Sequence, residues 1–457
     1  MSSVSIPSGT RDFSPVELRR RNYIFDIIKQ AFVRFGYSPI ETPAMENLIT
    51  LTGKYGDEGD QLLYKILNSR IHESKDKEKL QAEFNRSLAA STNSSVLTER
   101  ALRYDLTVPF ARYVVMHRNE ITLPFKRSQI QPVWRADKPQ KGRYREFFQC
   151  DADVIGSKSL WNEIELIKLI DYIFTKINLG VCIKLNNRKI LSALALMCDA
   201  ENKVIDLTVA IDKLEKIGMD KVLEELQCKG FSTTAIEKLL PILNLTGSNE
   251  EKINTLKVTL ANYELGVAGL DELQYVLEQV KTVKTKIEID LTLARGLNYY
   301  TGAIIEVTVN DSRSAFTSSI CGGGRYDDLT GIFGMPGVSG VGISFGADRI
   351  YDVLLECNLF PDFGVQDESY MCVNFGNTEA PYAAAIVDKL RAAGKSSILY
   401  PDADKIKKQM SYANSYNFKY VIVAGSEEIE SNSITLKNMI SGEQQKISLT
   451  DFFAMVE

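Results

Sequence analysis

Charged and polar residues that could bind a polar ligand are concentrated in WRADKPQKGRYREFFQCDAD, residues 134–153. If the second half of this stretch is a strand, its period of two places Arg145, Phe147, Gln149, Asp151 and Asp153 on one face. Such a face suits the floor of a polar site, although a solvated sheet face fits the pattern equally well. The preceding loop adds cations that suit phosphate binding but are also typical of an ordinary charged hairpin: Arg135, Lys138, Lys141 and Arg143.

A second group of candidate residues lies in LARGLNYYTG, residues 293–302. The apolar strand face that leads into it ends at Arg295, and a guanidinium there is costly unless an anion meets it. Tyr299 and Tyr300 add hydroxyl groups and flat rings. The pattern predicts a ligand site, and a structural Arg–Asp pair beside core tyrosines remains an alternative.

Two glycine-bearing segments follow. In CGGGRYDD, residues 321–328, we expect a turn whose backbone N–H groups face a ligand, although it lacks the Lys-Ser/Thr ending of a P-loop. In GISFGADRI, residues 342–350, a strand passes into a helix whose first turn carries Asp348 and Arg349. Arg349 could then reach over a nucleotide bound on the sheet.

The remaining composition narrows the possible chemistry. The seven cysteines form no C-x-x-C pair and there are only two histidines, so we expect no disulfide framework and no metal site. Catalysis must then depend on carboxylates, arginines and backbone amides. The net charge of −5 does not suggest a nucleic-acid partner, but local basic patches can still bind phosphate. No apolar run is long enough to span a membrane, and no secretory signal is visible. Both observations favour a cytoplasmic protein without a membrane partner.

The elements that must position these residues divide the 457-residue chain into several parts. A helix is predicted from Pro15, after the N-cap Ser14, to about Phe35, with Gly36 ending it. Strand-rich segments are expected in residues 1–187 and 286–357, separated by helices with turn signals in 188–285. A linker is expected at 358–367, and alternating strands and helices in 368–457 predict a small α/β domain.

In order and spacing, these pieces resemble the three signature motifs of class II aminoacyl-tRNA synthetases. GYSPIETP with Pro43 is similar to the first motif, VWRADKPQKGRYREF to the second and GVGISFGADRI to the third. ARGLNYYTG resembles the RGLDYYTG signature of histidyl-tRNA synthetases, with Asn298 in place of Asp. LRYDLTVPFARY, the N-terminal GTRDF and the C-terminal α/β domain extend this resemblance over nearly the whole chain.

The resemblance implies an α+β catalytic domain with a six-stranded antiparallel sheet flanked by helices, a helical insertion and a C-terminal α/β anticodon-binding domain. It implies a homodimer that activates L-histidine with ATP and Mg²⁺ and transfers it to the 3′ end of tRNA(His). An alternative is the non-catalytic paralogue that regulates histidine biosynthesis, which generally lacks the C-terminal domain. A threonyl or prolyl enzyme is a more distant alternative.

The resemblance also implies a role for individual residues. Asp105 and Thr107 would hold the α-amino group of histidine, and Gln149 its backbone. Asp153 and Tyr299 would bind the two imidazole nitrogens, with Tyr300 lining the same pocket. Arg135, Arg295 and Arg349 would surround ATP, the first two as catalytic residues. Lys138, Gln140 and Lys141 would contact the acceptor end of the tRNA, and no residue is expected to bind a metal.

Overall fold

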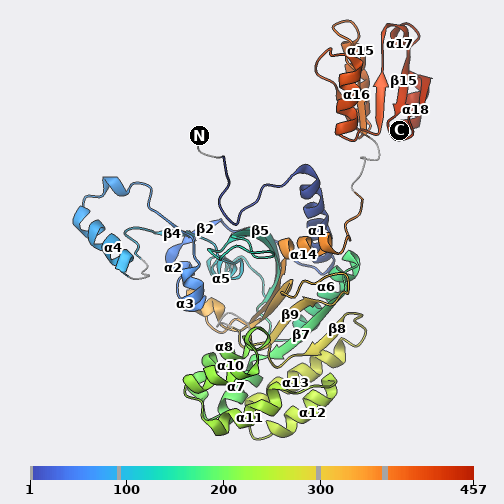
Figure 1. The fold of residues 1–457 in the computed structure, drawn as a ribbon. Coiled ribbons are helices and arrows are strands. Elements are labelled where there is room, and N and C mark those ends of the chain that lie inside the picture. Colours follow the sequence, from blue (N-terminus) through green and yellow to red (C-terminus); the bar gives the residue numbers. More distant parts are fainter. Residues whose placement is uncertain (1–3, 90–93, 295–299, 363–368, 457) are drawn as a thin grey trace. The chain divides into compact units, whose positions relative to one another are not determined.

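The computed structural model describes residues 4–89, 94–294, 300–362 and 369–456. The chain forms two compact units, Met1–Leu359 and Phe360–Glu457 (Figure 1). In the part of the chain that the structure describes, no helix is long and apolar enough to cross a membrane.

An eight-stranded mixed sheet is the centre of the first unit, in the order β1-β5-β6-β11-β10-β9-β7-β8. Six neighbouring strands are antiparallel: β5 (Phe125–Trp134), β6 (Glu146–Ile155), β11 (Gly340–Gly346), β10 (Cys321–Tyr326), β9 (Ala303–Val309) and β7 (Val181–Asn187).

The expected six-stranded antiparallel sheet is therefore wrong for the sheet as a whole. A parallel strand is added at each edge, β1 (Ser38–Pro39) beside β5 and β8 (Lys286–Ile289) beside β7. Parallel neighbours need a long crossover connection, and the helices between β7 and β8 supply one. β1 has only two residues, and its Pro39 suits an edge position.

Three helices cover one face of this sheet. In α1 (Pro15–Arg34), Ser14 and Glu17 form a capping box, so the predicted helix is confirmed at its start. The backbone turns at Phe35 and Gly36, and Gly36 has φ +75°, which glycine adopts without strain. α1 packs against α6 (Trp161–Ile177) and α14 (Ala347–Glu356), with Ile24, Ile28, Ala31 and Phe32 buried.

Helices fill the segment between β7 and β8, as the sequence predicts. They belong to the first compact unit, where α13 (Glu264–Gln279) packs against α7 (Arg188–Met197), β7 and β9. The remaining helices of the segment are α8 (Val204–Ile211), α9 (Leu214–Ile217), α10 (Met219–Cys228), α11 (Thr233–Leu243) and α12 (Asn249–Thr259).

A small sheet precedes α5 (Thr107–Met116), with its strands in the order β2 (Met45–Asn47), β4 (Arg100–Leu102) and β3 (Lys65–Ile66). β2 leads into α2 (Leu48–Leu51) and α3 (Gly56–Gln61). β3 and β4 are antiparallel neighbours although more than thirty residues separate them in the sequence. The intervening segment contains α4 (Lys77–Ala89), which has no buried side chain. The part of this segment that forms α4 is thus a surface excursion from the sheet.

The second unit is a five-stranded sheet in the order β13-β12-β14-β15-β16. β12 (Ser369–Cys372) is parallel to both β13 (Ser396–Leu399) and β14 (Tyr420–Val423). The predicted alternation of strands and helices is present, with α15 (Ala380–Ala392) and α16 (Ile406–Ser415) as the connections. The unit closes with α17 (Ser426–Glu430), β15 (Ser433–Asn438), β16 (Gln444–Ser448) and α18 (Leu449–Val456).

Candidate active site

A cavity of about 490 Å³ lies on the sheet of the first unit, beneath the loop that joins β5 to β6. β6 contributes Phe147 and Gln149, and β11 contributes Ser344 and Gly346. The remaining lining is mostly polar: Tyr104, Arg135, Asp137, Gln140, Lys141, Gly142, Arg143, Tyr144, Ser318, Ser319, Ile320, Cys321, Gly322, Asp348 and Arg349.

Two arginines of the cavity wall are held in fixed positions. Arg135 donates from Nε to the carbonyl of Tyr104 at 3.1 Å, and its guanidinium lies 4.2 Å from the centre of the Tyr104 ring. Arg349 donates to the carbonyls of Gly142 at 2.9 Å and Ser319 at 2.7 Å. Both cations are thus preorganised where a phosphate chain could meet them.

Polar contacts with α14 hold the β5–β6 loop over the cavity. Tyr144 donates its hydroxyl to Asp352 at 2.8 Å, and Lys141 forms an ion pair with Glu356 at 3.0 Å. Gln140 and Lys141 line the cavity, whereas Lys138 is exposed and does not. The loop therefore presents two of the three predicted acceptor-end residues to the cavity.

A smaller cavity of about 30 Å³ adjoins the first, and the two share Gly322 and Ser344. It is lined by Thr107, Asp151, Asp153 and Tyr300, together with Gly323, Tyr326, Gly342 and Ile343. Asp153 accepts a hydrogen bond of 2.5 Å from the Tyr326 hydroxyl. The period-two face predicted on β6 is confirmed from Phe147 to Asp153, since Phe147 and Gln149 line one cavity and Asp151 and Asp153 line the next. Arg145, which was predicted on the same face, precedes β6 and lines neither cavity.

Burial makes this second cavity electrostatically unusual. Asp105, Asp151 and Asp153 are each at most 2% exposed, and burial raises the pKa of all three, that of Asp151 to about 7. The Arg127 guanidinium opposes this shift for Asp151 and Asp153. Asp105 accepts from the Val108 amide and the Tyr55 hydroxyl, both at 3.1 Å.

Several buried acceptor atoms of this cluster have no hydrogen-bond partner among the described residues. They are Oδ2 of Asp105, Oε1 of Gln149 and Oδ1 of Asp151. Buried polar atoms are rarely left unpaired, so this cluster suits a small ligand rich in N–H donors. A compact cationic molecule with several N–H groups would satisfy both the acceptors and the excess of carboxylates.

CGGGRYDD forms strand β10 through Tyr326, and the predicted turn is therefore wrong. The glycines instead allow atoms of neighbouring segments to approach the backbone closely. A Cβ on Gly324 would lie 2.5 Å from the Ala303 carbonyl and 3.1 Å from the Tyr300 ring. On the neighbouring strand, a Cβ on Gly342 would lie 2.0 Å from Oδ1 of Asp153. Side chains at these positions would therefore occupy the space of Asp153 and Tyr300.

The structure brings most of the predicted ligand residues together around the two cavities. Asp105 is buried beside them, and Arg295 and Tyr299 lie outside the described residues. Arg145 instead donates to the carbonyls of Asp137 and Ser8. The residues around the cavities that the sequence interpretation missed are Arg127, Tyr326 and Ser344. For Arg127 a signal existed, because Arg127, Gln129 and Gln131 alternate along one strand.

Comparison with known proteins places this geometry in a family. Residues 92–350, more than half of the chain, match the family model described as Histidyl-tRNA synthetase. The chain belongs to the histidyl-tRNA synthetase family. Residues 370–457 match the model described as Anticodon binding domain.

Close relatives of this histidyl-tRNA synthetase family member span almost its full length. The histidine–tRNA ligase of Phocaeicola vulgatus is 56% identical over 99% of this chain and 98% of its own length. That of Porphyromonas gingivalis is 54% identical over 98% of this chain and 97% of its own.

Among solved structures, the histidyl-tRNA synthetase from Nostoc sp. PCC 7120 matches with a TM-score of 0.78 and 30% identity, covering 100% of this chain and 99% of that one. An ATP phosphoribosyltransferase regulatory subunit/histidyl-tRNA synthetase from Bacillus halodurans C has a TM-score of 0.72, covering 93% of this chain and 100% of that one. At 22% identity, this second likeness concerns the fold alone.

Proposed function

We propose that this chain is a histidine–tRNA ligase, which activates L-histidine with ATP to histidyl-adenylate and transfers it to the 3′ end of tRNA(His). The observation that carries the proposal is the direct junction of two cavities of different character. The larger has Arg135 and Arg349 in its wall, and the smaller adjoins buried Asp151 and Asp153. This arrangement suits a nucleoside triphosphate next to a small amino acid that carries a cationic amino group and ring N–H donors.

In the activation step, a carboxylate oxygen of histidine attacks the α-phosphorus of ATP and the bond to pyrophosphate breaks. The nucleophile is already an anion, so no general base is needed. Negative charge spreads over phosphate oxygens in the transition state, and preorganised cations stabilise it. We assign this role to Arg135 and Arg295, with Arg349 holding the nucleotide.

The smaller cavity would recognise the amino acid. Asp105 and Thr107 would take the α-amino group, and Gln149 the amino-acid backbone. Asp153 and Tyr299 would bind the two ring nitrogens, with Tyr300 in the wall. Unpaired acceptors such as Oε1 of Gln149 favour this assignment. A pocket that must satisfy buried polar groups rejects apolar amino acids of similar size strongly.

In the transfer step, the terminal ribose hydroxyl of the tRNA would attack the carbonyl carbon of histidyl-adenylate. The bond from that carbon to the phosphate oxygen would break, AMP would leave and the hydroxyl proton would be released. Lys138, Gln140 and Lys141 would contact the acceptor end through the β5–β6 loop. The second unit, which matches the anticodon-binding model, would contact the anticodon.

Mg²⁺ would be carried mainly by the phosphates of ATP. It characteristically keeps several waters and takes few protein carboxylates, together with substrate phosphates. Mg²⁺ would neutralise part of the phosphate charge.

The wider assignments are also proposals. Residues 1–187 and 286–357 would form the catalytic domain, 188–285 a helical insertion, 358–367 a linker and 368–457 the anticodon-binding domain. The enzyme would be a cytoplasmic homodimer joined through the first motif. The regulatory paralogue finds no support in the close relatives, because the ones described above are histidine–tRNA ligases over nearly their full length.

Histidine-dependent ATP–pyrophosphate exchange by the full-length protein tests the function. We expect exchange with histidine and none with threonine or proline, followed by charging of tRNA(His). Absence of exchange in a folded preparation would reject the ligase and leave the regulatory alternative.

A further inference from the structure

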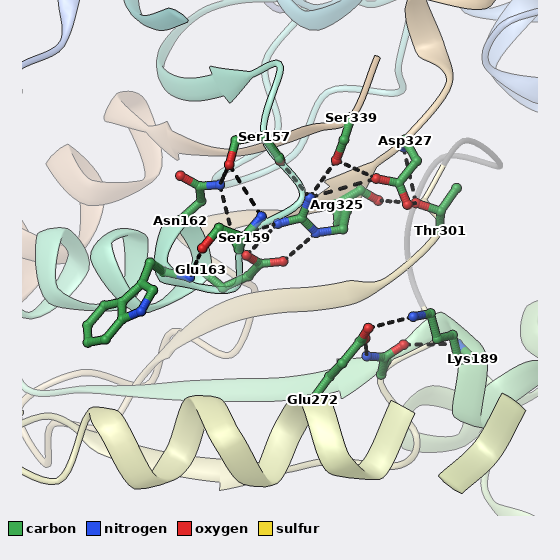
Figure 2. A network of polar contacts seen from close by, with 12 residues as sticks. Ser157, Ser159, Asn162, Glu163, Lys189, Glu272, Thr301, Arg325, Asp327 and Ser339 are labelled. Atoms are coloured by element: carbon green, nitrogen blue, oxygen red, sulfur yellow. Dashed lines mark hydrogen bonds and ion pairs between the residues drawn. The ribbon is translucent and has the colours of Figure 1, made fainter. Parts of the chain in front are cut away.

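Arg325, near the end of β10, has a hydrogen-bond partner for every N–H of its guanidinium (Figure 2). The two carboxylate oxygens of Glu163 on α6 accept from Nε and Nη2 of Arg325, both at 2.6 Å. The other guanidinium donors reach the Ser339 hydroxyl at 2.6 Å and the carbonyls of Ser157 and Ser159 at 3.1 and 3.2 Å. A guanidinium has five N–H donors, so this pattern uses all of them and fixes the strand end.

Asp327 extends this network toward Thr301. Its Oδ1 accepts from the Ser339 hydroxyl at 2.5 Å, and its Oδ2 accepts from the Thr301 hydroxyl at 2.7 Å. In return, the Asp327 amide donates to Oγ1 of Thr301 at 3.1 Å, and the Thr301 amide donates to the Arg325 carbonyl at 2.8 Å. The Thr301–Asp327 pair is therefore closed by hydrogen bonds in both directions (Figure 2).

The residues next to this pair line the smaller cavity. Tyr300 precedes Thr301, and Tyr326 precedes Asp327; both lie in the cavity wall with Asp153. Neither Thr301 nor Asp327 lines either cavity. Side chains alternate along a strand, so Tyr326 of β10 lines the cavity while Arg325 points to Glu163 on the other side. The Thr301–Asp327 hydrogen bonds thus restrain the backbone next to both tyrosines.

We propose that Thr301 and Asp327 are positioning residues for histidine recognition. Their mutual hydrogen bonds fix Tyr300 against Gly324, and the Arg325–Glu163 ion pair anchors this arrangement to α6. The inference rests on the proposed function, because it takes histidine as the ligand of the smaller cavity. It assigns the selectivity of the pocket partly to two side chains that do not touch the amino acid.

Thr301→Val is the most direct test, because it keeps the branched shape and removes only the hydroxyl. In pyrophosphate exchange by the full-length protein, we expect the KM for histidine to rise about tenfold, the effect of losing one or two ordinary hydrogen bonds. The KM for ATP should stay within about twofold, a range smaller than the effect of one such bond. Thr301→Ser keeps the hydroxyl and should restore the histidine KM.

Thr292→Val is a matched control. The Thr292 hydroxyl donates to Asp290 at 2.6 Å, in a similar Thr–Asp contact that lines neither of the two cavities. It should leave both KM values unchanged. Equal changes of the histidine and ATP KM values in Thr301→Val, or a lower melting temperature with unchanged KM values, would overturn the inference.

If Thr301→Val does not fold, the KM values for histidine and ATP are compared in Asp327→Asn instead. An unchanged histidine KM in Asp327→Asn would also overturn the proposal. Failure of the proposed function looks different. In that case the wild-type protein itself would show no histidine-dependent exchange.

Discussion

Asp151 and Asp153 lie two residues apart on β6 and face the same guanidinium, with Nη2 of Arg127 at 3.4 Å from Oδ2 of the first and 3.0 Å from Oδ2 of the second. All three side chains are almost completely buried. Two carboxylates therefore share one cation with very little exposure to solvent. The pocket holds more potential negative charge than positive charge, and the cationic amino group of an amino acid would reduce this imbalance.

This arrangement predicts how stability depends on pH. Burial raises the pKa of Asp151 to about 7 in the folded protein, above the value of about 3.9 for an unfolded chain. Between these values the folded state binds more protons than the unfolded state, so stability falls as the pH rises through this window. Asp151→Asn removes this ionisation, and its free energy of unfolding should therefore fall less between about pH 5 and about pH 8.

Urea denaturation of both proteins at the two pH values measures this difference. Asp388→Asn is the control, because Asp388 is 75% exposed and lies in the second unit. If Asp151→Asn shows the same pH dependence as the wild type, the ionisation of Asp151 does not contribute.

Asp153→Asn should impair histidine binding selectively. The substitution keeps the size of the side chain and an acceptor for Tyr326 but removes the charge. We expect the KM for histidine to rise on the order of 10²-fold, since a charged hydrogen-bond partner of a buried ligand contributes about 2–3 kcal/mol. The KM for ATP should change little. Pyrophosphate exchange with each substrate varied in turn measures both, and parallel losses would contradict the assignment.

Arg135→Ala should slow histidine activation by about 10² to 10³, as expected when one donor that stabilises the transition state is removed. Rapid-quench measurement of adenylate formation at saturating substrates checks the rate. Arg313→Ala is the control, since Arg313 pairs with Asp311 on the surface and does not line the cavities. A normal activation rate in Arg135→Ala would exclude this role.

Lys141→Ala should affect tRNA charging and leave histidine activation intact. Lys141 is 71% exposed at the cavity rim, where it forms an ion pair with Glu356. Losing one phosphate contact should reduce the salt dependence of tRNA binding by about one charge. Filter binding at several salt concentrations measures this slope. Lys176→Ala on α6 is the comparison, and equal slopes for the two variants would argue against a tRNA contact.

Glu163→Gln should destabilise the first unit by about 3–5 kcal/mol, because it leaves the Arg325 charge buried without its partner. Glu165→Gln, two residues along the same helix, removes a carboxylate that is 39% exposed and should cost less than about 1 kcal/mol. Urea denaturation of both variants gives the comparison. Similar losses would mean that the Arg325–Glu163 pair contributes no more than a surface ion pair.

Local signals in the sequence were sufficient for several elements. Ser14, Pro15 and Gly36 mark the ends of α1 because capping is a matter of neighbouring residues. The second unit could be predicted because its strands and helices alternate with short connections. The face of β6 that carries Gln149 and Asp153 followed from the period of a strand.

The pairing of strands that are distant in the sequence could not be predicted from such local signals. Nothing in the two residues of β1 reveals that they pair with β5, and β8 becomes parallel to β7 only through the intervening helices. The glycines of β10 suggested a turn, because a run of glycines is typical of turns. At Gly324, glycine is instead required by the close approach of Tyr300 and Ala303, which lie in another segment of the sequence. Arg127 and Tyr326 meet Asp153 from distant segments, and only the register of the sheet brings them together.

The base of the excursion that carries α4 is closed by a backbone hydrogen bond of 2.9 Å, which the Asn68 amide donates to the Leu97 carbonyl. The pairing of β3 with β4 fixes the same two ends, and α4 between them contributes no buried side chain. The two ends of the excursion are thus joined independently of what it contains. This makes the position a natural graft point, where a short turn or a reporter domain could be exchanged for the native segment without changing the strand register.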